Sequence, residues 1–288
     1  MRHWRDAAVA SARLVSERPE LWLPGALAWV SSVGWIPFVV AVMRPPTVAE
    51  LTFLGARIVT SGSWPWNGVL IAAAAAAVVL LAFVLVAAAN AVLIGQVDGR
   101  RPTLDDVRRT LGINLVAAAP AGLATVVVLL AVAAVAPAEF NAPEPAGGPI
   151  LRTIADVAPY LVLLLLTSVA GGALAAVAGR ISVRDRSGTL SSLRSAAART
   201  LTVSPTIHAA LTVLAQVIFL GFAAVLLGVL WAPIGVQLGF GEIEVATGLL
   251  LVGFVAIWLC LVLAGGALHA WAAATWSRLL ATDAPGRT

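Results

Sequence analysis

Long apolar stretches alternate with short, Arg-bearing amphipathic segments along this chain. A helix needs about 20 apolar residues to cross the hydrocarbon core of a bilayer. A charge at the centre of such a helix costs about 2.5–3.5 kcal/mol, and none of the stretches carries Asp, Glu or Arg well inside it, apart from Arg180 at the end of the fourth. The pattern predicts an all-α integral membrane protein, one polytopic domain over residues 1–288, with six transmembrane helices. These helices are expected at residues 21–43, 67–96, 113–136, 157–181, 206–231 and 246–276.

An amphipathic helix is expected before the third span. The segment TLDDVRRTLGINL starts at Thr103, and Thr103 with Asp106 resembles a capping box. Its charged residues face away from an apolar stripe at helical spacing. The stripe consists of Leu104, Val107, Leu111 and Leu115.

A similar segment, TLSSLRSAAARTL, precedes the fifth span and starts at Thr189, the expected N-cap. Its stripe is Leu190, Leu193, Ala197 and Leu201. A basic segment also opens the chain. The sequence therefore predicts three tandem units of one amphipathic helix and two spans, with boundaries at 1–97, 98–183 and 184–288.

Short matches between these units favour an internal repeat. Ala-Gly-Gly-Ala-Leu occurs at Ala170–Leu174 and again at Ala264–Leu268. Ancestral triplication would explain them. The alternative is a shared architecture without common descent, because Ala, Gly and Leu dominate membrane helices. True repeats of two spans would share one orientation about an axis along the membrane normal.

Small residues recur every four positions in the even-numbered spans. Lipid solvates Leu as well as a neighbouring helix does, so close packing in a membrane depends on small side chains. We expect these positions to form the seams between helices, and the alternative is a homodimer face. The positions are Ala87, Ala91, Gly95, Gly171, Gly172, Ala175, Gly179, Gly265, Gly266 and Ala270.

Composition supports a membrane location. The chain is 60% hydrophobic and 11% charged, whereas soluble domains average about 25% charged residues. Three arginines, Arg44, Arg57 and Arg152, lie on one side of the predicted spans. The other side carries Arg2, Arg5, Arg13, Arg18, Arg100, Arg101, Arg108, Arg109, Arg180, Arg184, Arg186, Arg194, Arg199, Arg278 and Arg287.

This asymmetry orients the chain, because cytoplasmic loops are enriched in basic residues. It predicts a multi-pass protein of the prokaryotic plasma (inner) membrane with both termini in the cytoplasm. The Arg-bearing helices would meet anionic lipid headgroups there. The arginines flank apolar spans without interleaved aromatic residues, so nucleic acid is not an expected partner.

The loops on the opposite side offer two further expectations. Residues 47–58 could form a short interfacial helix or a loop. Residues 137–149 are rich in Pro, Gly and Ala and are expected to be irregular.

Few polar side chains lie in or beside the spans, and all of the candidates fall in the expected cytoplasmic half or just beyond it. One interpretation is a polar vestibule open to the cytoplasm, with histidines able to titrate near neutral pH. The other is a set of isolated interhelical hydrogen bonds, each contributing about 0.6–2 kcal/mol. The candidates are Asn90, Asn114, His208, Gln216 and His269.

Catalytic motifs are not apparent. The spans contain no Asp, and GxSxG and HExxH are absent. The single Cys260 can form neither an internal disulfide nor a zinc site alone. The sequence therefore predicts a non-enzymatic protein without cofactor or metal, with a structural, partner-binding or lipid-organising role. The alternative is a small-molecule or lipid transporter that uses the vestibule.

One set of motifs resembles a known group. The basic start RHWRDAAVASARLVSERPELWLPG, a Pro at the first span, and Asp98-Gly99 followed by Thr103-Leu104 are similar to poorly characterised six-span prokaryotic membrane proteins. That group includes the membrane domain sometimes fused to glycerophosphodiester phosphodiesterases. A weaker version recurs at Ser187–Leu190. The resemblance implies a fold and a membrane location.

Overall fold

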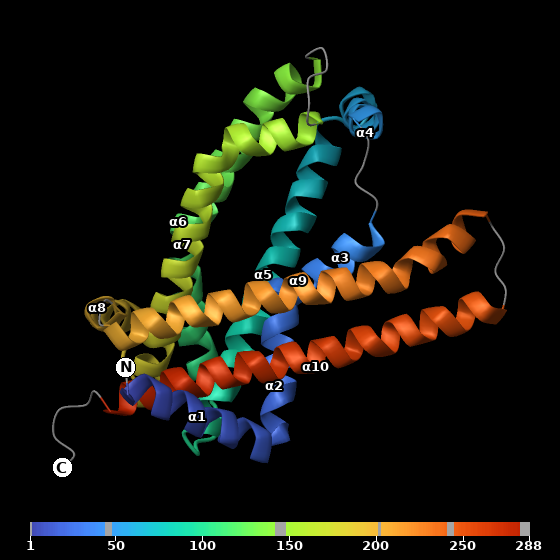
Figure 1. Cartoon of the computed structure of the whole chain (residues 1–288). Helices are drawn as coiled ribbons and strands as arrows, with labels where there is room; N and C mark the ends of the chain where they lie inside the picture. The colour runs from blue at the N-terminus through green and yellow to red at the C-terminus, as the bar shows by residue number, and fades with distance from the viewer. Residues whose placement is uncertain (1, 44–47, 142–147, 201–202, 241–244, 283–288) are drawn as a thin grey trace.

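The computed structural model describes residues 2–43, 48–141, 148–200, 203–240 and 245–282, and every element within these ranges is a helix (Figure 1). The predicted all-α class is confirmed. Arg44, Leu201, Arg287 and part of the predicted irregular segment 137–149 lie outside the described residues. In chain order the elements are α1 (Arg2–Glu17), the 3-10 turn η1 (Pro19–Leu21), α2 (Trp22–Trp29), the π-turn η2 (Val30–Gly34), α3 (Ile36–Val42), α4 (Val48–Thr60), α5 (Trp66–Val97), α6 (Leu104–Asn141), α7 (Pro149–Asp185), α8 (Thr189–Thr200), α9 (Val203–Phe240) and α10 (Val245–Thr282).

Five of these helices, α5, α6, α7, α9 and α10, are long and apolar enough to cross a membrane. A sixth span is reached only if the bent pair formed by Pro19–Gly34 and Ile36–Val42 is counted as one. The chain is therefore a multi-pass helical membrane protein.

The first predicted span, 21–43, is not one straight helix. Its two halves meet at an angle of 51° after the π-turn Val30–Gly34. Pro37 lacks the N–H that would continue the helix, and its ring crowds the carbonyl four residues earlier. Ser32 Oγ donates to the carbonyls of Ala28 and Trp29, and Gly34 packs against the Trp29 ring. The bend therefore lies at Trp35, two residues before the proline.

The capping box predicted at Thr103 is confirmed. The Thr103 N–H donates to Asp106 Oδ2 at 2.9 Å, and the Asp106 N–H donates to Thr103 Oγ1 at 3.2 Å. However, α6 then runs without interruption to Asn141, so the amphipathic segment and the third span form one helix. The prediction that residues 137–149 are irregular is wrong for residues 137–141, which belong to α6. Arg152 in α7 bonds both the side chain and the carbonyl of Glu139, which joins this part of α6 to α7.

The predicted apolar stripes of the amphipathic helices are only partly buried against other helices. In α6 the buried positions are Asp106, Thr110 and Ile113, whereas Leu104 is 89% exposed. In α8 they are Ser192, Leu193 and Ala196, whereas Leu190 is 79% exposed. A helix buries the face that meets its neighbour, and polar side chains can share that face when they are hydrogen-bonded. The predicted N-cap also moves by one residue, because α8 begins at Thr189 and the Gly188 carbonyl accepts the Ser192 N–H.

Two long antiparallel hairpins spread apart from one end of the molecule, α6 with α7 and α9 with α10 (Figure 1). The helix α5 rises between them, and α1 and α8 lie where the hairpins meet. We call this meeting region the base; it comprises α1, α8 and the parts of α5, α6, α7, α9 and α10 that adjoin them.

The base contains most of the packed core. One cluster joins α6, α7, α8 and α10 and includes Ile113, Val177, Leu193 and Trp276. A second joins α1, η1, α5 and α10 through Val15, Leu21, Leu93, Ala270, Ala273 and Ala274. A third follows α9 and α10 outward and meets Phe38 of α3. Two of the three clusters thus lie in the base, and the third lies along α9 and α10 outside it.

The small residues predicted as seams fall into two groups. A Cβ added at Gly266 would lie 2.5 Å from the Ala26 nitrogen, and one at Gly171 would lie 2.4 Å from the Ala117 carbonyl oxygen. Gly265 lies against the Trp29 ring, and Gly179 is in ordinary contact with Ile94. Gly266, Gly171 and Gly265 therefore lie at close helix crossings. Ala87, Ala91 and Ala270 are fully buried, and Ala175 is partly buried beside the first cluster.

Two of the predicted seam residues do not meet another span. A Cβ added at Gly172 meets no atom within 4 Å, because its neighbour Gly171 occupies the contact and successive helix residues point about 100° apart. A Cβ added at Gly95 would lie 2.9 Å from the Arg100 carbonyl oxygen. Gly95 therefore makes room for the loop that follows its own helix.

Candidate functional site

Arg180 lies near the end of α7, and only 5% of its surface is exposed. Its Nε donates to Ser277 Oγ at 3.1 Å, and its Nη2 donates to the Ala273 carbonyl oxygen at 2.6 Å, both in α10. Nη1 donates to Ala176 in its own helix. The guanidinium group has five N–H donors in a rigid fork, which suits several carbonyl and hydroxyl acceptors at once. Arg180 thereby joins α7 to α10.

Arg184 lies one turn further along α7 and pairs with Asp98 at the end of α5. Its Nε and Nη2 each donate to one carboxylate oxygen of Asp98 at 2.8 Å. Nη2 also donates to the Ser277 carbonyl oxygen at 2.9 Å. Two-pronged pairs of this kind are strong and directional. Asp98 and Arg184 are the first residues of the second and third predicted units.

Ser277 connects these two arginines. Its hydroxyl accepts from Arg180 and its carbonyl accepts from Arg184. The three chain segments that meet here, the ends of α5, α7 and α10, are far apart in the sequence. This network was missed by the sequence analysis. Its only signal was Arg180, a charge at the end of an otherwise apolar stretch.

His208, one of the predicted vestibule residues, is fully buried between α9, α1 and α10. Trp4 Nε1 donates to its Nδ1 at 3.3 Å, and its Nε2 lies 3.1 Å from the Ala272 carbonyl oxygen. Because Nδ1 accepts, Nε2 carries the proton and donates to Ala272. Trp271 and Trp276 pack edge-on against the imidazole. His208 thus has both ring nitrogens occupied by neighbouring helices.

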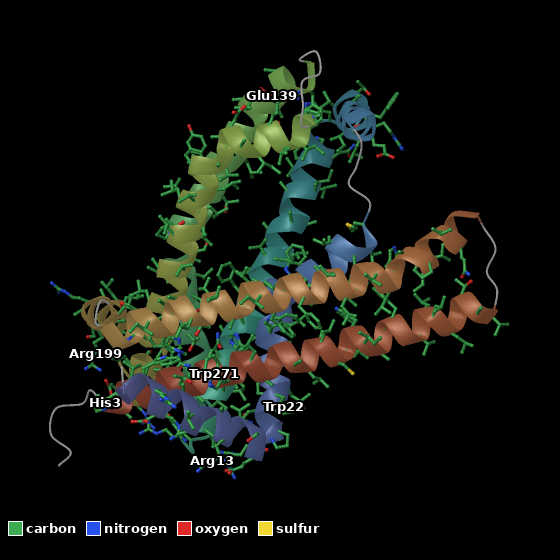
Figure 2. All side chains as sticks on the ribbon, viewed as in Figure 1. His3, Arg13, Trp22, Glu139, Arg199 and Trp271 are labelled. Carbon is green, nitrogen blue, oxygen red and sulfur yellow. The ribbon has the colours of Figure 1, made fainter. Side chains whose placement is uncertain are left out.

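Two indoles attach α1 to the rest of the base. One is Trp4, through His208. The other is Trp271, whose Nε1 donates to the Ala8 carbonyl oxygen at 3.0 Å. Figure 2 places Trp271, Trp22 and Arg13 at this end of the molecule, far from Glu139 at the tip of the α6–α7 hairpin. The stripe of α1 that holds Ala8, Ser11 and Val15 is buried.

His269 and Asn90 form a separate pair between α10 and α5, with His269 Nε2 3.2 Å from Asn90 Oδ1. Asn114 and Gln216 are half-buried on α6 and α9, and Asn114 Nδ2 lies in a buried position without a protein partner. Among the described residues, the His269–Asn90 hydrogen bond is the one that joins two of the five predicted vestibule residues. In the described part of the chain, His208, Asn114 and Gln216 are not hydrogen-bonded to one another or to this pair.

The polar side chains of the base form hydrogen bonds between helices. The described residues hold no group of three His, Cys, Asp or Glu side chains placed to bind a metal ion, and Cys260 is exposed on α10. The base instead gathers arginines, tryptophans and hydroxyls that bond backbone carbonyls across helices.

Comparisons with protein-family models, with curated proteins and with solved structures find no match to this chain. The resemblance drawn from the sequence motifs therefore stays a prediction. The fold and the base define a multi-pass helical membrane protein.

Proposed function

We propose that this protein is a non-enzymatic integral membrane protein of a prokaryotic plasma membrane that organises lipid around its splayed helices, with both termini in the cytoplasm. The observation that carries the proposal is the exposure of the outer part of α5. Residues 69–81 of α5 are exposed on every side of the helix. Apolar side chains exposed around a whole helix require an apolar solvent.

Two other long helices, α7 and α9, each expose one apolar face. On α7 the exposed residues include Leu163, Leu165 and Leu166, and on α9 they include Leu214, Val217 and Ile218. Lipid tails solvate such surfaces as well as protein does. A molecule with this form presents more apolar surface to lipid than a closed bundle of the same helices, which supports a lipid-organising role.

The polar residues support the same proposal over the transporter alternative. A transporter of polar solutes needs a path lined by polar groups. His208 and the His269–Asn90 pair instead bond neighbouring helices. Their hydrogen bonds hold the base together and leave the outer halves of the helices apolar.

A nitroxide scan of α5 tests the proposal. Single cysteines at Ala76, Ala77, Val78 and Val79, in a Cys260→Ala background, would carry the spin label in nanodiscs of phosphatidylcholine and phosphatidylglycerol. We expect high collision rates with oxygen, which partitions into lipid, and low rates with a water-soluble nickel chelate at all four positions. Labels at exposed Arg108 and Arg194 are the aqueous controls.

Two outcomes would contradict the proposal. Oxygen access that falls on one face at helical spacing would show that a partner chain covers α5. Nickel access on one face would show a water-filled path and support the transporter.

A further inference from the structure

A cavity of about 860 Å³ opens at the base beside the loop between α5 and α6. The loop and the first turn of α6 form one wall, and Val183, Arg184 and Arg186 at the end of α7 form the other. None of the five predicted vestibule residues lines it. Five arginines and two aspartates line the cavity, so its formal net charge is +3.

The loop that forms this wall is held rigidly at both ends. At the end of α5, Gly99 has a φ of +68°, the Arg100 N–H donates to the Gly95 carbonyl at 2.7 Å, and the Gly99 N–H donates to the Gln96 carbonyl. These bonds form a Schellman motif, in which a left-handed glycine ends the helix. Three residues after Arg100, Thr103 begins the capping box that starts α6. Arg100 and Arg101 are therefore carried on a short, doubly capped turn.

Several of the lining charges are already engaged. Arg184 is paired with Asp98, and the Asp106 carboxylate caps α6. Arg109 lies 3.5 Å from the exposed carboxylate of Asp105. The unengaged positive charge of the cavity therefore lies on the remaining arginines.

Arg100, Arg101 and Arg186 have no carboxylate partner among the described residues. The Arg100 guanidinium donates to the Arg184 carbonyl oxygen at 3.2 Å. Arg186 is held at the end of α7 in a left-handed conformation, with a φ of 49°. Three guanidinium groups from two elements therefore border one cavity. Guanidinium groups bind phosphate oxygens through paired N–H donors.

We propose that this cavity binds a phosphate group, carried by an anionic lipid headgroup or by a free phosphate. Leu104 favours the lipid source, because it lines the same cavity and is 89% exposed. An apolar side chain beside a cluster of arginines suits an amphiphile whose phosphate and acyl chain lie side by side. This inference deepens the proposed lipid-organising role and rests on it for the choice of lipid.

The test uses the full-length protein in neutral detergent. Native mass spectrometry would follow the first lipid bound during titration with dioleoylphosphatidylglycerol, with dioleoylphosphatidylcholine in parallel. The cavity variant is R100Q/R101Q/R186Q. The matched control is R5Q/R13Q/R194Q, which removes the same charge from exposed positions on α1 and α8. A second arm would titrate inorganic phosphate and measure its competition with the lipid.

One basic residue near an anionic lipid surface strengthens binding by roughly fivefold. We therefore expect the cavity variant to bind phosphatidylglycerol at least about tenfold more weakly, the control variant to stay within about threefold, and the unfolding temperatures of both to match the parent. The single variant R101E should also lose affinity, which keeps the test independent of the triple change.

Binding of inorganic phosphate that is lost only in the cavity variant, without lipid binding, would support a soluble phosphate source. Equal affinities of the cavity and control variants for both probes would overturn the proposal. That result would leave the lipid exposure of α5, measured separately by oxygen access, untouched.

Discussion

At the scale of single residues, Arg180 shows how one charge can be placed at the end of an apolar helix. Its guanidinium group is satisfied by the Ser277 hydroxyl and by carbonyls of Ala273 and Ala176. Hydrogen bonds to a charged group contribute about 1.5–3 kcal/mol each, and their loss is only partly compensated by water.

Replacing Arg180 by Ala should lower the free energy of unfolding by about 2–3 kcal/mol, because it removes the bonds that join α7 to α10. Denaturation in mixed micelles measures this change. Arg194→Ala removes an exposed arginine from α8 and should change stability by less than about 0.5 kcal/mol. Equal effects of the two substitutions would mean that the Arg180 network contributes nothing specific.

Two glycines of the repeated Ala-Gly-Gly-Ala-Leu motif differ in their surroundings. A Cβ at Gly266 would meet the backbone of α2, at 2.5 Å from the Ala26 nitrogen and 2.6 Å from the Trp22 oxygen, whereas a Cβ at Gly172 meets open space. Gly266→Ala should therefore force α2 and α10 apart and destabilise the protein by about 1–3 kcal/mol.

Gly172→Ala should leave stability unchanged or raise it by up to about 1 kcal/mol, because Ala is the better helix former. Thermal unfolding of both variants in the same detergent measures the difference. A loss at Gly172 as large as that at Gly266 would refute the assignment of these two contacts.

At the scale of elements, three indole N–H groups join α1 to other helices: Trp4 to His208 of α9, Trp271 of α10 to Ala8, and Trp22 of α2 to Val15 near the end of α1. The first two hold the part of α1 that contains Arg5. The double variant Trp4→Phe, Trp271→Phe keeps most of the apolar surface and removes both donors. We expect α1 to detach more often, so trypsin should cleave after Arg5 and Arg13 several-fold faster. Limited proteolysis followed by mass spectrometry measures the rate.

Trp35 offers the control for this change. Its indole donates to the Ser32 carbonyl within the same segment and is half exposed. Trp35→Phe should leave cleavage of α1 at the parent rate. Faster cleavage in this variant would indicate a general loosening of the fold.

The elements also show how far local sequence signals reach. Apolar length alone located the five long helices, and Thr103 with Asp106 located the start of α6. The bend in 21–43 had local signals too, in Pro37 and Gly34, but hydrophobicity averaged over the segment concealed them. The faces of α6 and α8 that pack against other helices had no local signal, since they depend on which neighbour each helix meets.

The base shows where sequence reasoning stops. His208, His269 and Asn90 could be identified as polar residues in apolar spans, but their partners could not, because each contact joins helices distant in the chain. The Asp98–Arg184 pair spans 86 residues. Asp98 and Arg184 are each common residue types at a helix end, so neither indicates its partner. Only the tertiary structure brings the two together.

At the scale of the whole molecule, the base is packed and the two hairpins diverge from it (Figure 1). The sequence predicts apolar spans but not the angles between them. An apolar side chain can face lipid at any of these angles, so the hydrophobic pattern does not distinguish them. The tight crossings lie near the base, at Gly25 with Gly266 and at Gly171 with Ala117. The divergence thus follows from where close contacts occur along the helices.

Distances between spin labels on α7 and α10 test this divergence most directly. Both helices end at the base, where Arg180 and Ser277 join them. Labels at Asp185 and Ala281 form an inner pair, and labels at Ile154 and Leu249 form an outer pair. Each outer label lies about 45 Å along its helix from the inner one.

Double electron–electron resonance in nanodiscs should give an outer distance longer than the inner distance by about 20 Å or more, because arms of this length amplify the spread. Packed neighbouring helices keep their axes about 8–10 Å apart along their whole length. Outer and inner distances that agree within about 10 Å would therefore show a closed bundle and contradict the splayed structure.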